Sequence, residues 1–296
     1  MNTLDNAPTK PAHDLFHYSA PVPGEILVIG DGFEAKSFKH ASFSGLMDPV
    51  VMVDHFVMSQ PTFGEHPHAG MSAVSVLFED SVGVFNSQDS LGNNDDLKPG
   101  DLYWLKAGRG ATHDEKPVAD GIAHGLQIFV NLPSKSKSDS PRAFHISSRD
   151  MPVIKSSDFR VRVVLGQSND VVGQKSPSFP LTILDAYLNP KGHYKHKIQG
   201  DQSLWAYAVA GQISLSLEGM HFALSEGEAI AIHINTEQAE LSLAADDGAH
   251  AVLLQGAPIR EQFVQRGPFV MSNSSELDAI VVAHKQGRLG SIKAAQ

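Results

Sequence analysis

The 296-residue chain contains no cysteine. This absence excludes disulfide bonds, thiolate ligands to a metal and a cysteine nucleophile. Any metal site in the chain therefore has to be built without thiolate donors.

Basic residues and long apolar runs are also scarce. The 23 lysines and arginines face 33 aspartates and glutamates, which gives a formal net charge of −10. This charge argues against a broad phosphate-binding surface, so we expect no direct nucleic-acid partner. No apolar run approaches the roughly 20 residues that span a bilayer, and residues 1–20 lack the basic start and apolar centre of a signal peptide. We therefore expect no membrane association and a cytoplasmic location.

What the chain does contain is a series of short apolar segments separated by turns. Hydrophobic residues make up 42% of the chain and charged residues 19%, which is typical of a globular protein with an ample core. Many short strands with frequent turns indicate an all-β sandwich or barrel. The clearest strand-like segments are residues 25–30, 50–56, 72–78, 102–105 and 124–132.

Two short motifs place candidate metal ligands two residues apart: His66-Pro67-His68 and His113-Asp114-Glu115. On a β-strand this spacing points both side chains to one face. Two such strands facing each other would direct three imidazoles and one carboxylate to a single point, a donor set that suits Fe, Mn, Co, Ni, Cu or Zn. The alternative is that these are surface or hydrogen-bonded residues among the 15 histidines. Two such pairs beside turn-forming residues favour the metal site.

The second half of the chain faintly repeats the first. Gly227-Glu228 follows Gly100-Asp101 by 127 residues, and Ala249-His250 follows Ala123-His124 by 126. Two matches at nearly one offset favour tandem copies of one barrel. The offset of 127 carries the four candidate ligands onto His193, Lys195, Glu240 and Ser242, with His196 close by. Because a lysine ammonium would repel a cation, we expect one metal per chain, in the first barrel.

The C-terminal tail differs from the rest of the chain. Residues 273–276 offer side-chain oxygens that can cap a helix. An apolar stripe with helical spacing follows and ends at Gly287; its members are Leu277, Ile280, Val281 and His284. We expect an amphipathic helix whose apolar face packs on a barrel.

The motifs together resemble those of the pirin family in the cupin superfamily, and they keep the family's order over nearly the whole chain. The resemblance implies two tandem cupin barrels with a metal, typically iron, only in the first. It also implies that the ligands are His66, His68, His113 and Glu115. The matching segments are Asp48-Pro49, Val53-Asp54-His55-Phe56, His66-Pro67-His68, Asp89-Ser90-Leu91-Gly92, Gly100-Asp101-Leu102-Tyr103-Trp104, Ala107-Gly108-Arg109-Gly110, His113 with Glu115, His124-Gly125-Leu126-Gln127, Val130-Asn131-Leu132-Pro133 and Gly267-Pro268-Phe269-Val270-Met271.

This organisation divides the chain into four parts. We expect residues 1–133 to form the metal-binding barrel and residues 161–266 a second barrel without metal. Residues 134–160 begin with the polar stretch S-K-S-K-S-D-S, which reads as a linker or solvated loop. Residues 267–296 are expected to form the C-terminal helix and tail.

The chain departs from the family pattern beside the first ligand pair. Family members often carry arginine, glycine, an aromatic residue and glutamate where this chain has Ala69-Gly70-Met71-Ser72. They often carry a histidine before the Asp-Ser-Leu-Gly turn, where this chain has Asn86-Ser87-Gln88. These differences predict an altered wall beside the metal and leave the substrate open.

The resemblance implies two classes of function. Several members resemble flavonol 2,3-dioxygenases, which open the ring of quercetin with dioxygen and release carbon monoxide; here Glu115 would serve as the base for a small aromatic or enolic substrate. Other members act as transcriptional cofactors or bind metabolic enzymes, so a protein partner is the alternative. A third reading is a metal that only stabilises the barrel. We favour the enzyme, because an open, histidine-rich site exceeds what a structural ion requires.

Overall fold

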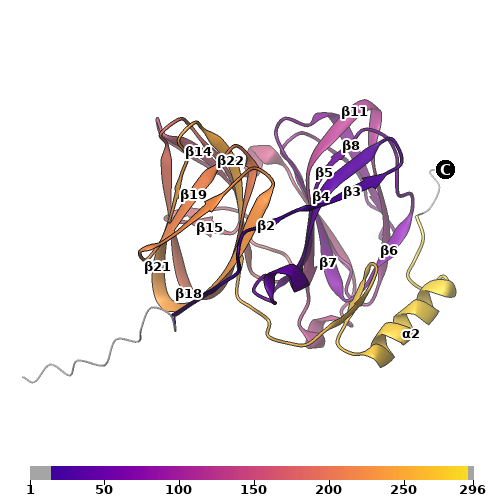
Figure 1. The fold of residues 1–296 in the computed structure, drawn as a ribbon. Helices are drawn as coiled ribbons and strands as arrows, with labels where there is room; N and C mark the ends of the chain where they lie inside the picture. Colours follow the sequence, from indigo (N-terminus) through magenta and orange to yellow (C-terminus); the bar gives the residue numbers. More distant parts are fainter. Residues whose placement is uncertain (1–14, 293–296) are drawn as a thin grey trace, which may run out of the picture.

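The computed structural model describes residues 15–292. Figure 1 shows two β-barrel units side by side, with the yellow helix α2 (Ser274–Lys285) next to the first unit. This arrangement confirms the predicted all-β fold of two tandem barrels followed by a C-terminal helix. Among the described residues, no helix is long and apolar enough to cross a membrane.

The first unit is a ten-stranded sheet. Its main path runs β12-β10-β7-β11-β5-β4-β3, while β6 and β8 also pair with β11 and β9 pairs with β8. The strands are β3 (Glu25–Ile29), β4 (Phe33–Lys39), β5 (Val50–Met58), β6 (His66–His68), β7 (Met71–Leu77), β8 (Val82–Asp89), β9 (Asn94–Leu97), β10 (Leu102–Lys106), β11 (Ala111–Asn131) and β12 (Arg142–Ile146). Short 3-10 helices occupy His40–Phe43, Ser134–Ser136 and Ser148–Asp150.

Strand β11 joins the two layers of this unit. Its first half pairs with β6 and β8, and its second half pairs with β5 and β7. The sequence predicted a strand over residues 124–132 and a strand at His113 and Glu115, but it did not predict that the two form one continuous strand. In the structure Ala119 adopts a φ of 53° and the register shifts between Val118 and Ile122. The chain therefore bulges and continues as one strand.

The second unit is also a ten-stranded sheet. Its main path runs β13-β14-β17-β22-β18-β21-β19-β20. The eight strands of this path are β13 (Val153–Lys155), β14 (Phe159–Leu165), β17 (Leu181–Leu188), β18 (His193–Ala210), β19 (Ile213–Leu217), β20 (Met220–Leu224), β21 (Glu228–Ala244) and β22 (Ala249–Gly256). Two small hairpins lie outside it: β15 (Gln167–Ser168) with β16 (Val171–Val172), and β23 (Val264–Arg266) with β24 (Phe269–Met271).

The start of the described chain contributes to the second unit, although the sequence placed it in the first. Strands β1 (Phe16–Tyr18) and β2 (Val22–Pro23) pair with β21. Nothing in a local sequence pattern specifies such a distant partner, so periodicity alone could not predict it.

The segment expected to be a linker is also structured. Strand β12 pairs with β10 of the first unit, and β13 pairs with β14 of the second. Within its polar start, the Lys137 side chain is buried. The Lys137 ammonium donates to the carbonyls of Gly70 and Val270 at 2.8 and 3.0 Å and to Oδ1 of Asn131 at 2.5 Å. A polar residue with three internal acceptors can be buried, and this is why a stretch that reads as solvated is partly core.

The two units share an apolar core. One cluster of buried side chains includes Val53, Val74 and Trp104 from the first unit and Trp205 and Leu254 from the second. Because side chains alternate along a strand, the opposite positions of β5 point into the first barrel. That interior is where the candidate site lies.

Helix α2 begins as the sequence predicted. Asn273 caps it by accepting a hydrogen bond from the Glu276 backbone amide at 3.0 Å, and the left-handed Gly287 follows its end. Its buried residues Leu277 and Ile280 pack against Ala69 and Phe269. The apolar face of the helix therefore covers the edge of the first barrel next to β6.

Candidate metal centre

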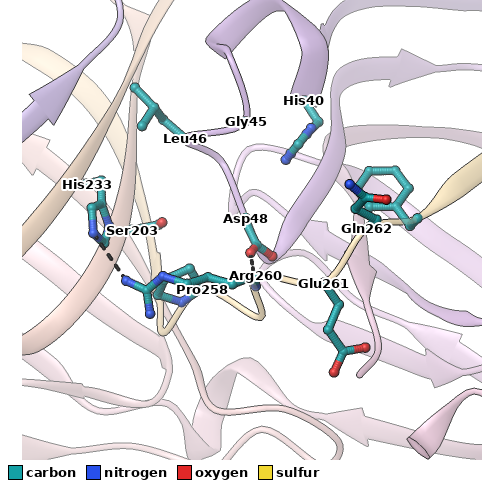
Figure 2. A pocket seen from close by; sticks show the side chains of 11 residues that line it. His40, Gly45, Leu46, Asp48, Ser203, His233, Pro258, Arg260, Glu261 and Gln262 are labelled. Atoms are coloured by element: carbon teal, nitrogen blue, oxygen red, sulfur yellow. Dashed lines mark hydrogen bonds between the residues drawn. The ribbon is translucent and has the colours of Figure 1, made fainter. Parts of the chain in front are cut away.

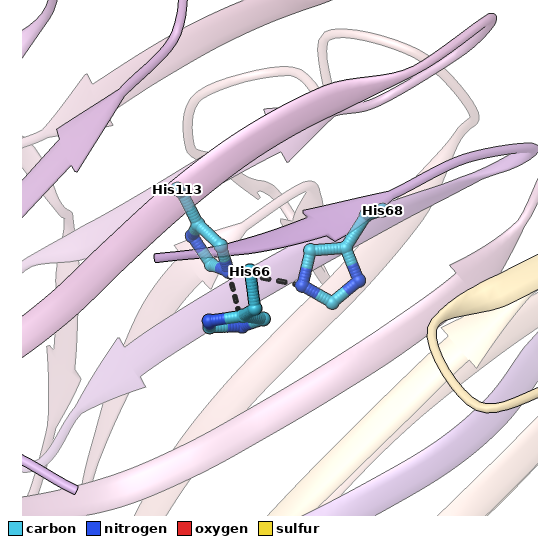
Figure 3. Close-up of side chains that lie close together, drawn as sticks. All are labelled: His66, His68 and His113. Carbon is cyan, nitrogen blue, oxygen red and sulfur yellow. Dashed lines mark hydrogen bonds between the residues drawn. The ribbon is translucent and has the colours of Figure 1, made fainter. Parts of the chain in front are cut away.

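Three histidines converge inside the first barrel (Figure 3). Strand β6 pairs antiparallel with the start of β11, and this pairing places His113 directly opposite His66. His66 and His68 share one face because they are two residues apart on a strand. Nε2 of His113 lies 3.0 Å from Nε2 of His66 and 2.9 Å from Nε2 of His68.

The ring nitrogens of this group cannot all form well-directed hydrogen bonds with one another. Nδ1 of His66 donates to the Gly64 carbonyl at 2.8 Å, so Nε2 of His66 carries a lone pair. Nε2 of His113 has two close nitrogen neighbours, and it carries at most one proton. At most one of the two nitrogen contacts is therefore a well-directed hydrogen bond. A cation between the imidazoles would instead be bound by all three nitrogens.

The spacing of the nitrogens fits a coordinated ion. Nitrogens bound to a metal at about 2.1 Å lie about 3.0 Å apart when the bonds meet at right angles, and about 3.4 Å apart in a tetrahedron. The two observed separations, 2.9 and 3.0 Å, match the right-angled case. Three nitrogens in this arrangement would leave the other coordination positions of a six-coordinate ion open to further ligands.

Burial keeps the three imidazoles neutral. Loss of contact with water is the main cause that lowers the pKa of His66, His68 and His113, with His68 at about 3 and His113 well below its usual value. For His68 and His113 the neighbouring imidazoles lower the pKa further. All three side chains therefore present lone pairs at neutral pH.

Glu115, the fourth residue of the predicted ligand set, is buried beside this group but is not part of it. Its Oε1 accepts a hydrogen bond from the Ser75 hydroxyl at 2.7 Å, and its Oε2 lies 3.8 Å from Nδ1 of His113. Burial raises the pKa of this carboxyl group to about 7. A cation among the imidazoles would stabilise the charged carboxylate, so the position suits a ligand or a proton acceptor.

His66, His68 and Glu115 border a cavity of about 340 Å³. Its walls are mainly apolar, and five of the lining residues are phenylalanines. The full set is Phe33, Met52, Asp54, Phe56, Met58, Phe63, His66, His68, Phe85, Glu115, Gln127, Phe129 and Pro268. The alternation Met52-Asp54-Phe56-Met58 along β5 was the sequence signal that could have found part of this wall.

The segments that depart from the family pattern are not part of the cavity lining, although Ser87 lies directly opposite Glu115 on the neighbouring strand. None of residues 69–72 and 86–88 lines the cavity. Ala69 packs on Phe269, Met71 belongs to a separate apolar cluster with Val51, and the Ser72 hydroxyl lies 3.0 Å from that of Ser178. The turn at Gly70, with a φ of 73°, directs this segment toward the C-terminal hairpin instead of the cavity.

A larger cavity of about 560 Å³ lies between the two units but offers no comparable donor group (Figure 2). It is lined by His40 and Asp48 from the first unit and by His233 and Arg260 from later in the chain. The Arg260 guanidinium is already paired with Asp201 at 2.6 and 2.7 Å. Of the described residues, only His66, His68 and His113 form a three-donor group.

Among the described residues, the second barrel offers no comparable group of three donors. The residues selected by the offset of 127 project outward: Lys195, for example, pairs with Glu240 at 2.6 Å on the surface. The offset of 127 therefore selects outward-facing positions, and repulsion by Lys195 is not the reason for the missing site. His196 is a buried histidine of this unit; it lies opposite Leu241 and is hydrogen-bonded to Ser168 and Gln255 at 2.8 and 2.7 Å.

Comparison with known proteins agrees with this geometry. A family model for Pirin matches residues 27–130, and one for the Pirin C-terminal cupin domain matches residues 183–290. A pirin-like protein of Solanum lycopersicum is 33% identical over 255 residues, which cover 82% of this chain and 81% of the relative. The chain belongs to the pirin family. Human pirin is 29% identical over 252 residues, covering 82% of this chain and 83% of that protein.

Solved structures show the same bicupin fold. A quercetin 2,3-dioxygenase from Acinetobacter baumannii superposes with a TM-score of 0.82 at 24% identity, covering 94% of this chain and 100% of that one. The bacterial pirin YhhW from Escherichia coli, solved in complex with nickel(II), has a TM-score of 0.61 at 19% identity and covers 82% of this chain and 100% of that one. The pirin fold and its three-histidine group are therefore established for this chain.

Proposed function

We propose that this pirin is a metal-dependent dioxygenase that cleaves quercetin or a related flavonol. The observation that carries the proposal is that two of the three converging imidazoles, His66 and His68, lie in the wall of a cavity lined by phenylalanines. A stabilising metal needs no adjoining cavity, whereas an enzyme for a flat aromatic substrate does. Similarity to a quercetin 2,3-dioxygenase in fold supports the same class of reaction.

The ligand set we propose is His66, His68, His113 and Glu115, holding one divalent first-row ion per chain. Iron is our first choice, with Mn, Ni, Co, Cu and Zn as alternatives. Glu115 would complete the set by a side-chain rotation, since it is adjacent to the imidazoles but is hydrogen-bonded to Ser75. A bound ion would supply an open coordination position that lowers the pKa of a substrate hydroxyl, and a redox-active ion would also promote reaction with dioxygen.

The chain itself would position the substrate and exclude water. The cavity volume of about 340 Å³ falls in the range of small-molecule sites. Rings such as Phe56 and Phe129 would hold a flat substrate by stacking or edge contacts. Glu115 is the carboxylate closest to the imidazoles and would accept the proton of the substrate's hydroxyl. In the overall reaction, flavonol and dioxygen give a ring-opened ester and carbon monoxide.

The alternative function, a non-enzymatic metal-binding regulator that acts on a protein partner, has one observation in its favour. The residue after His68 is hydrogen-bonded to the C-terminal hairpin: the Val270 amide donates to the Ala69 carbonyl at 3.0 Å. That hairpin leads directly into α2. A change in the position of His68 could therefore be transmitted through Ala69 and the hairpin to this surface helix.

A flavonol panel in air separates the two functions. Iron-reconstituted protein and metal-free protein would be compared by the loss of each flavonol's absorbance. Metal-dependent loss of at least one flavonol supports the dioxygenase. Fully loaded protein that consumes none would contradict it and leave the regulator.

A further inference from the structure

A row of polar side chains crosses the otherwise apolar inner face of the first sheet. Each member lies directly opposite the next on the neighbouring strand. On β5 and β11 the adjoining inward residues are Met52, Phe56 and Phe129, which line the same cavity. The members of the row are Ser37, Asp54, Gln127, Ser75 and Tyr103.

Toward both ends of this row, the side chains form hydrogen bonds with other residues of the protein. The Tyr103 hydroxyl donates to Asp89 at 2.6 Å. The Ser75 hydroxyl lies 2.7 Å from Oε1 of Glu115 and 3.0 Å from Oε1 of Gln127. At the other end, the Ser37 hydroxyl is hydrogen-bonded to the Asp54 carboxyl group.

In the middle of the row, two polar side chains each have an atom without a hydrogen-bond partner among the described residues. Oδ1 of Asp54 and Nε2 of Gln127 are buried and have no hydrogen-bond partner among residues 15–292. The two residues face each other across β5 and β11, yet they do not bond to each other. Because buried polar atoms are rarely left unpaired, this pair of an acceptor and a donor points to a missing group.

A hydroxyl group has the matching chemistry, since it can donate to the Asp54 oxygen and accept from the Gln127 amide. Both residues line the metal cavity. Ser75 links Gln127 to Glu115, so the pair lies one hydrogen-bonded residue away from the proposed ligand set. One flat molecule could therefore place one oxygen at the imidazoles and a second at this pair.

We propose that Asp54 and Gln127 form a polar subsite that binds a hydroxyl group of an aromatic substrate and selects its hydroxylation pattern. The inference rests on the proposed function, because it concerns the same cavity. It assigns the two residues to positioning and not to the reaction itself.

Anaerobic binding tests the subsite without turnover. Iron-loaded full-length protein would be titrated with 3-hydroxyflavone, which carries only the oxygens that would reach the metal, and with galangin, which adds two hydroxyl groups. We expect the unaltered protein to bind galangin about tenfold more tightly, the effect of one well-made hydrogen bond. Asp54→Leu and Gln127→Met should each remove this preference while leaving 3-hydroxyflavone affinity and metal content unchanged.

Met52→Leu, on the same strand and facing the same cavity, is the matched control and should keep the preference. A preference that survives in both subsite variants would overturn the subsite alone. Equal weakening of both flavones at full metal content would also overturn it, since the role would then be structural. If the unaltered protein binds neither flavone, the proposed function fails and the subsite fails with it.

Discussion

His113 lies directly opposite His66 across the antiparallel pair of β6 and β11, and their Nε2 atoms are 3.0 Å apart. His68 approaches the same Nε2 atom of His113 to 2.9 Å. Three imidazole nitrogens at these separations suit a bound cation.

Removing one imidazole should release the metal. In His68→Ala, loss of one donor should lower metal content sharply, while the far-ultraviolet circular dichroism of the β-fold is retained. Elemental analysis after dialysis is the measurement. His196→Ala, which removes a buried histidine of the second barrel, is the control and should leave metal content unchanged; full metal in His68→Ala would show that His68 is not a ligand.

The chain should bind a single metal ion. The inward positions of the second barrel carry aliphatic side chains such as Ile198, Leu241 and Leu243, which offer no donor atoms. Quantifying metal and protein in one dialysed sample should give one equivalent per chain, and less after His113→Ala. Two tightly held equivalents would contradict the assignment of the site to the first barrel alone.

Glu115→Gln should separate ligation from proton transfer. Glutamine keeps the shape and a carbonyl oxygen but accepts no proton at neutral pH. We expect much of the metal and the flavonol binding to remain, while turnover falls by roughly 10²–10⁴-fold, the usual contribution of a general base. Metal content, substrate affinity and turnover should be measured on one preparation. Unchanged turnover would remove Glu115 as the base.

Lys137→Met should destabilise the protein. It leaves three oxygen acceptors without their donor, which we expect to lower the free energy of unfolding by about 2–4 kcal/mol. Chemical denaturation measures this, and Lys135→Met on the neighbouring exposed position should have little effect. An equal effect of both substitutions would contradict a specific role for Lys137.

The same residue should give the stability a pH dependence. Burial is the main cause that lowers the pKa of Lys137 to about 8, from an ordinary value of 10.5. Between these values the unfolded chain binds more protons than the folded one, so this group's contribution to stability rises with pH. The contribution is complete above the higher value and is lost as the pH falls through about 8. Lys137→Met should lack this rise in denaturation curves between these pH values.

Local patterns predicted the parts of the site that depend on one strand at a time. The spacing of His66 and His68, and of His113 and Glu115, fixes a common face because side chains alternate along a strand. The Asn273 cap of the last helix was equally local. In each case the neighbouring residues alone determine the geometry.

Features that depend on distant partners could not be predicted in this way. Strands β1 and β2 pair with β21 more than two hundred residues later. Lys137 is buried because Gly70 and Val270 supply acceptors from opposite parts of the chain. The repeat offset selected outward-facing residues such as Lys195 and Glu240, because a shift of a single residue exchanges the inward and outward faces of a strand.

Carbon monoxide release by iron-loaded protein tests the central claim most directly. Quercetin loss, dioxygen uptake and carbon monoxide should be measured together in a sealed vessel, with His113→Ala as the matched control. The proposal predicts equimolar loss of quercetin and dioxygen, an equal amount of carbon monoxide, and none of these with the control. Full iron occupancy without carbon monoxide, or equal release by the control, would contradict it.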